Sequence, residues 1–549
     1  MQRWQQEKGL PAKGEAPIRM NDFSKPLPLK FSLRRGGIFV LSWAALAAVF
    51  ALSAWSRDLV VDQAQLLNHA AQFLDGRVLY SEIQDSHLPS TVLVFSIPVL
   101  LSRLSGLPPI LAFNIFVSLL TVACALTGAR FAAGRNAPGL AALLAAIAFL
   151  AQNDALFGQR ESLFHTVWLV YLIARLNPPR GAPALELAVG LAAGFCTAIK
   201  PQFLAYALVD EALLLWWTRS LRHPALIGAA IAGTSVILLF FGVFNWRDYF
   251  SGVQFGAAYY RIVGLPPSTV IANMWLSPSL HAVVWLIAAC LAWWGWQRRV
   301  PRLAVLFLAV IAVTVPLVVQ QGQARSYYFI GITLPALMLG AMVVAEALMN
   351  WAAPGGDIGA GKQAERRQIG FVQVAVSAII VAVGIRVMSG PDVGVMTQAW
   401  SRLRTGQPVA LFGPPAADPF VADWNSRSRP GETFAVLSAQ YGLVAFDPLV
   451  SAVRLRQPIY SRYNGIELDF LFAFADADQQ RLALVCAGIA RDLRFSHATW
   501  LYIRQDVPPW AKPGEFDAQL HAVPECAAAI DSDYVKVDAF DRYFVYRHR

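Results

Sequence analysis

"GGIFVLSWAALAAVFALSAWSRDLVVDQAQLLNHAAQFL", residues Gly36–Leu74, joins an apolar run to a segment of a different kind. The run ends at Trp55, and Asp62 follows about two helical turns later. After Asp62, apolar residues recur at helical spacing, which predicts an amphipathic helix lying on a membrane surface with Asp62 at its start. The residues of this apolar stripe are Leu66, Ala70, Phe73 and Leu74.

Composition indicates that the chain crosses the membrane many times. Of its 549 residues, 56% are hydrophobic and only 15% are charged, and the mean hydropathy is +0.47. A soluble core of this size needs far less apolar surface. The net charge of +10 comes from short basic clusters between apolar runs, as the positive-inside rule places them, and no recognition module for nucleic acid is present.

Eleven runs, counted approximately, have the length and composition of membrane spans. The first is too long for a cleaved signal peptide, so we expect an uncleaved span preceded by a basic cytoplasmic N-terminus, residues 1–35. The predicted spans are Gly36–Trp55, Pro108–Ala132, Pro138–Ala151, Leu163–Leu176, Ala184–Ile199, Phe203–Trp217, Ala225–Phe244, Leu280–Trp296, Leu303–Val319, Phe329–Met349 and Phe371–Met388.

The segment Leu88–Gly106 is apolar enough to span, but Pro89, Pro98 and Arg103 interrupt it. If it lies on the outer surface as a juxtamembrane helix, every strong basic cluster falls in a cytoplasmic loop; if it spans, all of them fall outside. We therefore interpret it as a juxtamembrane helix. The clusters are Arg130 and Arg135, Arg175 and Arg180, Arg219 and Arg222, Arg298 to Arg302, and Lys362 to Arg367.

This topology gathers ionisable residues at one membrane face, where charge next to hydrocarbon is costly and invites a functional explanation. Simpler interpretations exist. Arg160 and Glu161 could form an ion pair that orders their loop, and Asp62 or Asp154 could cap a helix. The gathered residues are Asp62, Asp154, Arg160, Glu161, Lys200, Arg261 and Arg325.

The order of these motifs resembles the GT-C superfamily of glycosyltransferases that use polyprenyl-phosphate sugars, especially the bacterial branch similar to aminoarabinose transferases and protein O-mannosyltransferases. The resemblance covers about residues 36–350. It departs from the family pattern at Gln63 and at His87. The residues that carry it are Asp62, Ala71, Gly76, Tyr80 and Pro89 in the first outer loop, Asp154 with "FGQRE" (Phe157–Glu161), Lys200 in "AIKPQF", and "QGQARSYYF" (Gln321–Phe329).

The resemblance implies sugar transfer with inversion from a lipid-phosphate donor to a hydroxyl of a glycan, lipid or protein acceptor. Asp62 is the predicted general base, because an attacking hydroxyl must lose a proton. The leaving phosphate is anionic and needs cations, for which we predict Arg160, Lys200, Arg261 and Arg325. Asp154 and Glu161 are candidates for positioning the acceptor or holding Mg²⁺ or Mn²⁺; Tyr80, His87, Tyr327 and Tyr328 are candidates to line the site.

Two alternatives stay open at this stage. An oligosaccharide polymerase or ligase would use a lipid-diphosphate donor in a similar setting. A flippase or transporter of lipid-linked sugars would also place charges beside an amphiphilic substrate, although no internal repeat typical of transporters is visible.

The C-terminal region has a different composition. After the transmembrane part, residues 36–390, charge density rises, and residues 391–549 predict a small α/β domain on the periplasmic side of a bacterial inner membrane. Cys486 and Cys526 both lie in this domain, where oxidation is possible, so we expect them to pair. The predicted strands are Pro408–Gly413, Thr433–Ser438, Ala498–Gln505 and Asp541–His548, with a helix around Asp469–Leu493.

Overall fold

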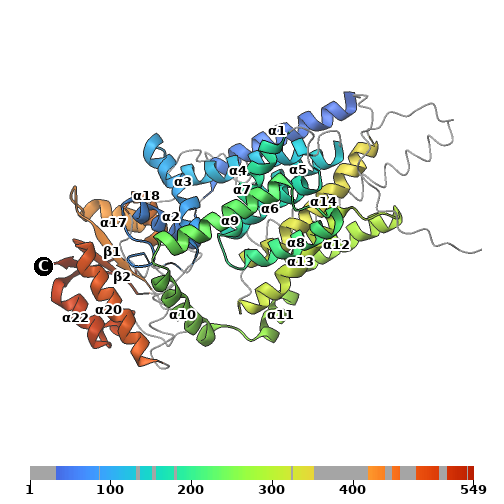
Figure 1. The fold of residues 1–549 in the computed structure, drawn as a ribbon. Helices are drawn as coiled ribbons and strands as arrows, with labels where there is room; N and C mark the ends of the chain where they lie inside the picture. Colours follow the sequence, from blue (N-terminus) through green and yellow to red (C-terminus); the bar gives the residue numbers. More distant parts are fainter. Residues whose placement is uncertain are drawn as a thin grey trace, which may run out of the picture.

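The structure is a computed structural model in which a long helical part is joined to a small part that contains a sheet (Figure 1). It describes residues 33–57, 59–83, 85, 87–131, 136–150, 156–177, 182–322, 326–351, 418–438, 448–457, 478–505, 516–540 and 542–549.

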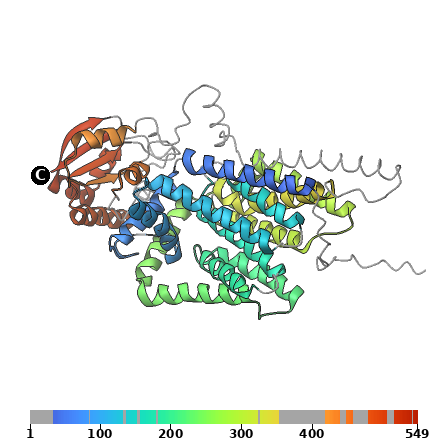
Figure 2. The same ribbon diagram turned by 90° about the horizontal axis from the view of Figure 1, so that it is seen from above.

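All the predicted apolar runs coincide with helices except the last, Phe371–Met388, which lies outside the described residues. Helix α1 runs lengthwise along the helical part and contacts α4 and α5 (Figure 2). The helices are α1 (Leu33–Ser56), α4 (Pro109–Phe131), α5 (Asn136–Leu150), α6 (Arg160–Leu176), α7 (Pro183–Thr197), α8 (Phe203–Thr218), α9 (Pro224–Val243), α12 (Pro278–Trp296), α13 (Arg302–Gln320) and α14 (Ile330–Trp351).

The chain is a multi-pass membrane protein by its candidate spans. Within the described ranges, 4 helices are long and apolar enough to cross a membrane, or up to 5 if the bent pair of α11 and α12 forms one span. The predicted number of about eleven spans is therefore not confirmed. Several of the other helices have only 15–17 residues, and a length of about 20 residues is typical of an upright span. The candidate spans are α4, α9, α13 and Ile330–Met349 of α14.

Small residues allow α7 and α9 to pack closely. A Cβ atom added to Gly190 would lie 2.0 Å from the carbonyl oxygen of Ala225, and one added to Gly194 would lie 2.1 Å from that of Ala229. These positions leave no room for a side chain, so the backbones of α7 and α9 can come close together. Small-xxx-small contacts between membrane helices work in the same way.

Within the residues described, four further helices lie in the connections between the apolar runs, and the sequence pattern predicts two of them. The predicted amphipathic helix forms α2 (Val61–Leu74), and the segment interpreted as juxtamembrane forms α3 (Pro89–Ser105), which ends at Gly106 with a φ of 73°. The long connection that follows α9 contains two further helices, α10 (Trp246–Val263) and α11 (Pro267–Leu276).

The C-terminal part holds a mixed four-stranded sheet in the order β1-β2-β4-β3. Strands β1 and β2 are parallel, and β4 pairs antiparallel with both β2 and β3. The sequence pattern missed β3, and the predicted strand Pro408–Gly413 lies outside the described residues. The elements are β1 (Phe434–Leu437), β2 (Trp500–Arg504), β3 (Tyr534–Phe540), β4 (Tyr543–His548), α17 (Pro419–Arg427), α18 (Pro448–Leu455), α20 (Gln479–Ser496), α21 (Phe516–His521) and α22 (Pro524–Asp533).

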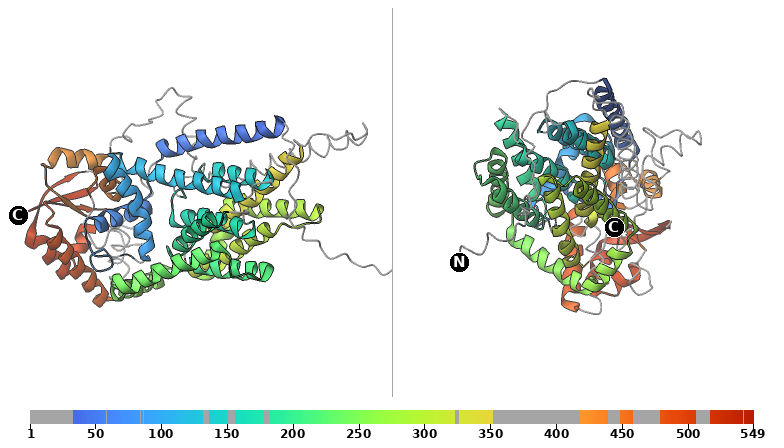
Figure 3. Two further views of the ribbon diagram at one scale, coloured as in Figure 1. Left: turned by 45° about the horizontal axis from the view of Figure 1, so that its top comes forward. Right: turned by 90° about the vertical axis from the view of Figure 1, so that its right-hand side faces the viewer.

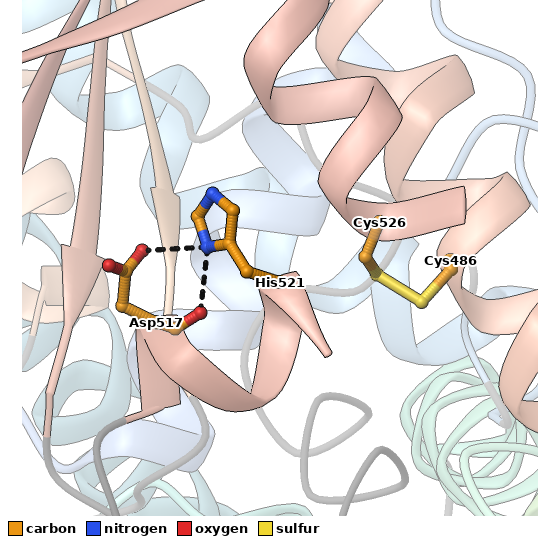
Figure 4. The surroundings of a disulfide bond; sticks show 4 residues. All are labelled: Cys486, Asp517, His521 and Cys526. Carbon is orange, nitrogen blue, oxygen red and sulfur yellow. Dashed lines mark hydrogen bonds and ion pairs between the residues drawn. A yellow bond between two sulfur atoms is a disulfide. The ribbon is translucent and has the colours of Figure 1, made fainter. Parts of the chain in front are cut away.

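A disulfide joins Cys486 of α20 to Cys526 of α22, the two cysteines that were expected to pair (Figure 4). Close to it in Figure 4, the Nδ1 of His521 lies 2.8 Å from the backbone oxygen of Asp517 and 3.4 Å from its carboxylate. The disulfide therefore links α20 to α22, whereas the contacts between His521 and Asp517 lie within one helix, Phe516–His521.

The sheet-containing part lies at the end of the helical part that carries α2 (Figures 1 and 3). Helix α18 packs against α2, and Arg456 donates hydrogen bonds to the carbonyl oxygens of Gly106 and Leu107, at 2.6 and 3.0 Å. From the other side, Phe255 and Ala258 of α10 join the apolar core of the C-terminal part. This end of the molecule is therefore held together by contacts from both halves of the chain.

Candidate functional site

Four segments that are distant in sequence bring charged side chains into one cluster. Asp62 lies in the first turn of α2, and Lys200 lies in the short connection between α7 and α8. Arg160 and Glu161 are the first two residues of α6, and Asp85 and His87 lie in the loop before α3. All six side chains are at least largely buried.

The turn before α6 explains how Arg160 and Glu161 reach this place. Gly158 has a φ of +69°, a conformation that L side chains rarely adopt, and a Cβ atom there would lie 2.5 Å from the Phe113 ring. The chain therefore turns sharply at Gly158 and presents the start of α6 to the first outer loop.

Arg160 has two partners in the cluster. A guanidinium nitrogen lies 3.7 Å from Oδ2 of Asp62, and another contacts Nε2 of His87. The side chains of Arg160 and Asp62 are 8% and 13% exposed, so this pair is only weakly screened by water. One cation thus connects the predicted base to the loop that precedes α3.

Lys200 and Glu161 form a second, closer ion pair. The Nζ of Lys200 lies 2.5 Å from Oε1 of Glu161, with side-chain exposures of 11% and 6%. The Oε2 of Glu161 is buried and has no hydrogen-bond partner within the described part of the chain, and the ammonium of Lys200 lies 5.1 Å from the centre of the Tyr328 ring. The cation is therefore near an aromatic face but is neutralised by a carboxylate.

Asp85 lies between two histidines and is almost completely buried. Its Oδ2 is 3.1 Å from Nδ1 of His69, its Oδ1 contacts Nδ1 of His87, and the backbone N–H of His87 donates to Oδ1 at 2.8 Å. Burial alone would raise the pKa of Asp85, but His87 and His69 outweigh it and hold the pKa well below its ordinary value.

The partners of His87 fix its protonation. Arg160 can only donate, so Nε2 of His87 must accept, and the proton of the neutral ring is on Nδ1, facing Asp85. Burial and the nearby Arg160 lower the pKa of His87 although Asp85 acts in the opposite sense, which agrees with a neutral ring.

Tyr80 stabilises the loop that carries His87. Its backbone has a φ of 74°, which is uncommon for a residue with a side chain, and its hydroxyl donates to the carbonyl oxygen of His87 at 2.8 Å. The ring packs edge-on against Tyr249 of α10, 5.0 Å between centroids. Tyr80 is thus buried behind the cluster, where it supports the loop.

The structure does not place the other predicted residues in this cluster. Arg261 is exposed on α10, and no described contact connects it to Lys200 or Arg160. Asp154 and Arg325 lie outside the described residues, and Tyr327 belongs to the short 3-10 helix η1 (Ser326–Phe329).

The simpler interpretations of the charged residues differ from the structure. The ion pairs described for these two residues join Arg160 to Asp62 and Glu161 to Lys200, so each reaches a different segment of the chain. The N-cap of α2 is Val60, so Asp62 is not the capping residue.

Sequence reasoning missed His69 and Asp85. His69 is on the buried face of α2, within a pattern interpreted only as amphipathic. The spacing of Asp85 two residues before His87, in the same outer loop, is the signal that could have found the pair, because a carboxylate there can orient the imidazole.

Among the described residues, the cluster contains no group of metal ligands. Within the described ranges, no group of three or more His, Cys, Asp or Glu side chains is placed to hold an ion. The carboxylate of Asp62 faces Arg160, and the carboxylate of Asp85 faces two histidines through their Nδ1 atoms. The predicted metal candidates stay a prediction, because Asp154 lies outside the described residues, and Glu161 pairs with Lys200.

No protein-family model matches the chain, and no curated protein matches it either. The structure is similar over most of its length to several solved structures. One is ArnT from Cupriavidus metallidurans bound to undecaprenyl phosphate: 14% identity, TM-score 0.46, covering 93% of this chain and 98% of that one.

Two further structures show similarity of the same extent. The arabinofuranosyltransferase AftD from mycobacteria has 16% identity and a TM-score of 0.43, and the match covers 94% of this chain but 40% of AftD. The oligosaccharyltransferase of Archaeoglobus fulgidus, tethered with an acceptor peptide, has 11% identity and a TM-score of 0.43, covering 94% of this chain and 74% of that one.

Proposed function

We propose that the protein is a membrane glycosyltransferase that moves a sugar from a polyprenyl-phosphate donor to an acceptor hydroxyl. The observation that carries the proposal is the buried cluster in which one carboxylate, Asp62, lies beside a guanidinium, with a second cation, Lys200, in the adjoining ion pair. Burying charges at a membrane costs free energy, so a buried cluster of charges usually marks a functional site. A carboxylate base beside two cations suits the transfer of a group whose leaving group is an anion. The motif resemblance of residues 36–350 agrees with it.

In the proposed reaction the acceptor oxygen attacks the anomeric carbon from the side opposite the phosphate. A bond forms between these two atoms while the bond from the anomeric carbon to the phosphate oxygen breaks, and that oxygen keeps the electron pair. The hydroxyl proton moves to Asp62, whose Oδ2 is buried and makes no hydrogen bond to the residues that the structure describes. Inversion at the anomeric carbon follows from a single displacement.

The cations in this scheme bind the phosphate. Arg160 offers a planar fork and Lys200 a compact point charge, and both are preorganised by neighbours, which lowers the cost of orienting them during the reaction. Each cation already has a carboxylate partner, so the donor phosphate competes with Asp62 for Arg160 and with Glu161 for Lys200. Binding of the donor thereby releases Asp62 from Arg160 to act as a base.

The proposed location is a bacterial inner membrane, with the cluster and the C-terminal part on the periplasmic side. This orientation follows from the positions of the basic clusters in the sequence. The acceptor is then a glycan, lipid or protein reached from outside the cytoplasm.

Transfer from a labelled polyprenyl-phosphate sugar to a panel of acceptor alcohols tests the proposal. The purified protein should transfer label, and Asp62→Asn should abolish most of the transfer while binding of undecaprenyl phosphate persists. Asp75→Asn is the matched control, since Asp75 makes a partly exposed pair with Arg103 at 2.9 Å elsewhere on the same loop. Wild-type transfer rates in Asp62→Asn would refute the role of Asp62. Transbilayer movement of the lipid without transfer would favour a flippase.

A further inference from the structure

His69, Asp85 and His87 form a continuous buried chain that ends on Arg160. From one end, Nδ1 of His69 faces Oδ2 of Asp85 at 3.1 Å, and Oδ1 of Asp85 contacts Nδ1 of His87. At the other end, Nε2 of His87 contacts the guanidinium of Arg160. The chain brings together α2, the loop before α3 and the start of α6.

Burying an ionised carboxylate is costly unless it receives hydrogen bonds. Asp85, at 1% side-chain exposure, receives three contacts from N–H groups, the two imidazoles and the backbone of His87. For both imidazoles to donate, each must carry its proton on Nδ1. Asp85 therefore sets the tautomer of both rings.

This tautomer has a consequence at each free end. For His69, Nε2 is left as a buried acceptor without a hydrogen-bond partner among the described residues, a cost that only its support of Asp85 offsets. For His87, Nε2 becomes an acceptor aimed at Arg160. With the opposite tautomer, an N–H of His87 would face an N–H of Arg160, and the two would repel.

We propose that Asp85, supported by His69, is a positioning residue that acts through the tautomer of His87 to hold Arg160 where it can meet the donor phosphate. This inference rests on the proposed function and adds three residues to it. Asp62 contacts the same guanidinium at 3.7 Å, so the chain also determines where Arg160 stands relative to the base.

The substitution Asp85→Asn tests the row of contacts from His69 to Arg160 and hardly changes the size of the side chain. Because Oδ1 of Asp85 faces both Nδ1 and the backbone N–H of His87, the asparagine oxygen should keep that position and the amide N–H should face His69. The negative charge that orients His87, and through it Arg160, is lost. Because charge on the bridging phosphate oxygen develops as the bond breaks, we expect kcat to fall more than KM rises. Loss of an orienting carboxylate is typically worth about 10–100-fold or more.

A second variant separates positioning from simple structural support. In His87→Gln, the amide oxygen can accept from Arg160 while the amide N–H donates to Asp85, so most of the activity should remain. His87→Leu is the contrasting variant, because leucine offers Arg160 no acceptor. Transfer by His87→Gln should exceed that by His87→Leu by about tenfold. A His87→Gln protein no more active than His87→Leu would overturn the proposal.

A spectroscopic readout keeps this test distinct from that of the proposed function. In ¹⁵N-histidine NMR of the full chain in nanodiscs, the signal missing from His87→Gln identifies His87. It should show a proton on Nδ1 and an unprotonated Nε2 in the wild type. If the wild type neither transfers sugar nor binds undecaprenyl phosphate, the proposed function fails whatever the tautomer. If the wild-type ring carries its proton on Nε2, the positioning role fails even where transfer is observed.

Discussion

The effect of Lys200 on stability can be separated from its effect on activity by comparing Lys200→Met with the double variant Lys200→Met/Glu161→Met. Lys200 and Glu161 form a 2.5 Å ion pair with 11% and 6% exposed side chains, and no described residue forms a hydrogen bond with Oε2 of Glu161. Methionine keeps the apolar stem of the lysine but leaves the carboxylate buried and uncompensated. Breaking a buried pair by removing one partner costs about 3–5 kcal/mol, and we expect the free energy of unfolding to fall by that amount.

The double variant Lys200→Met/Glu161→Met should recover the stability but not the activity. Replacing both partners of a buried pair by apolar side chains is neutral or stabilising in well-packed sites, so its free energy of unfolding should lie within about 1 kcal/mol of the wild type. Transfer should still be absent, because the phosphate has lost one of its two cations. Denaturant unfolding in micelles, followed by tryptophan fluorescence, measures the first quantity, and the labelled-donor reaction measures the second.

The half-exposed pair of Arg103 and Asp75 provides the control. Its atoms are 2.9 Å apart, but the side chains are 40% and 31% exposed, so Arg103→Met should cost at most about 1 kcal/mol. A Lys200→Met protein as stable as the wild type would refute the burial of its carboxylate partner, Glu161. Transfer at the wild-type rate by the double variant would refute the role of Lys200 in phosphate binding.

Three further outcomes are expected. Gly190→Ala should lower the thermal unfolding temperature, at a cost above ~1–3 kcal/mol, because its Cβ would lie 2.0 Å from a backbone oxygen of α9; Gly233→Ala, with its nearest contact at 3.9 Å, should not. Because the fold lowers the pKa of His87, the unfolded chain takes up a proton there below pH 6.5 while the folded protein keeps the ring neutral. The free energy of unfolding should therefore fall by up to ~1.4 kcal/mol per pH unit as the pH drops below 6.5. In pH-dependent unfolding, His87→Gln should lack this part of the decrease. Replacing Cys486 and Cys526 with serine removes the bond that closes a loop over a separation of 40 residues and should cost ~3–4 kcal/mol, and wild-type protein in reductant should unfold at the same denaturant concentration as the variant.

Local patterns predicted the elements well where a single physical signal dominates. Apolar runs bounded by proline or charge became helices, and the stripe after Asp62 became α2. The pattern failed for α10, which was interpreted as a connection, and for β3, whose alternation was masked by its charged and exposed residues.

The site was only partly predictable, because ion pairs between distant segments leave no local trace. Hydrophobicity indicated that Asp62, Glu161 and Lys200 share one face of the membrane, but which cation meets which carboxylate depends on packing. His69 and Asp85 were missed for the same reason, since each becomes informative only when the other is seen beside it.

The separation of Glu161 and Lys200 in the chain has a consequence for biosynthesis. They are 39 residues apart, so the ribosome makes the carboxylate about 2–8 s before the lysine at ~5–20 residues per second. During that interval Lys200 is not yet available to neutralise Glu161 at the amino end of α6. That end of the helix must lie in water, in the translocon or beside a lipid headgroup. The nascent helix therefore settles into its final depth only after the next hairpin has been delivered.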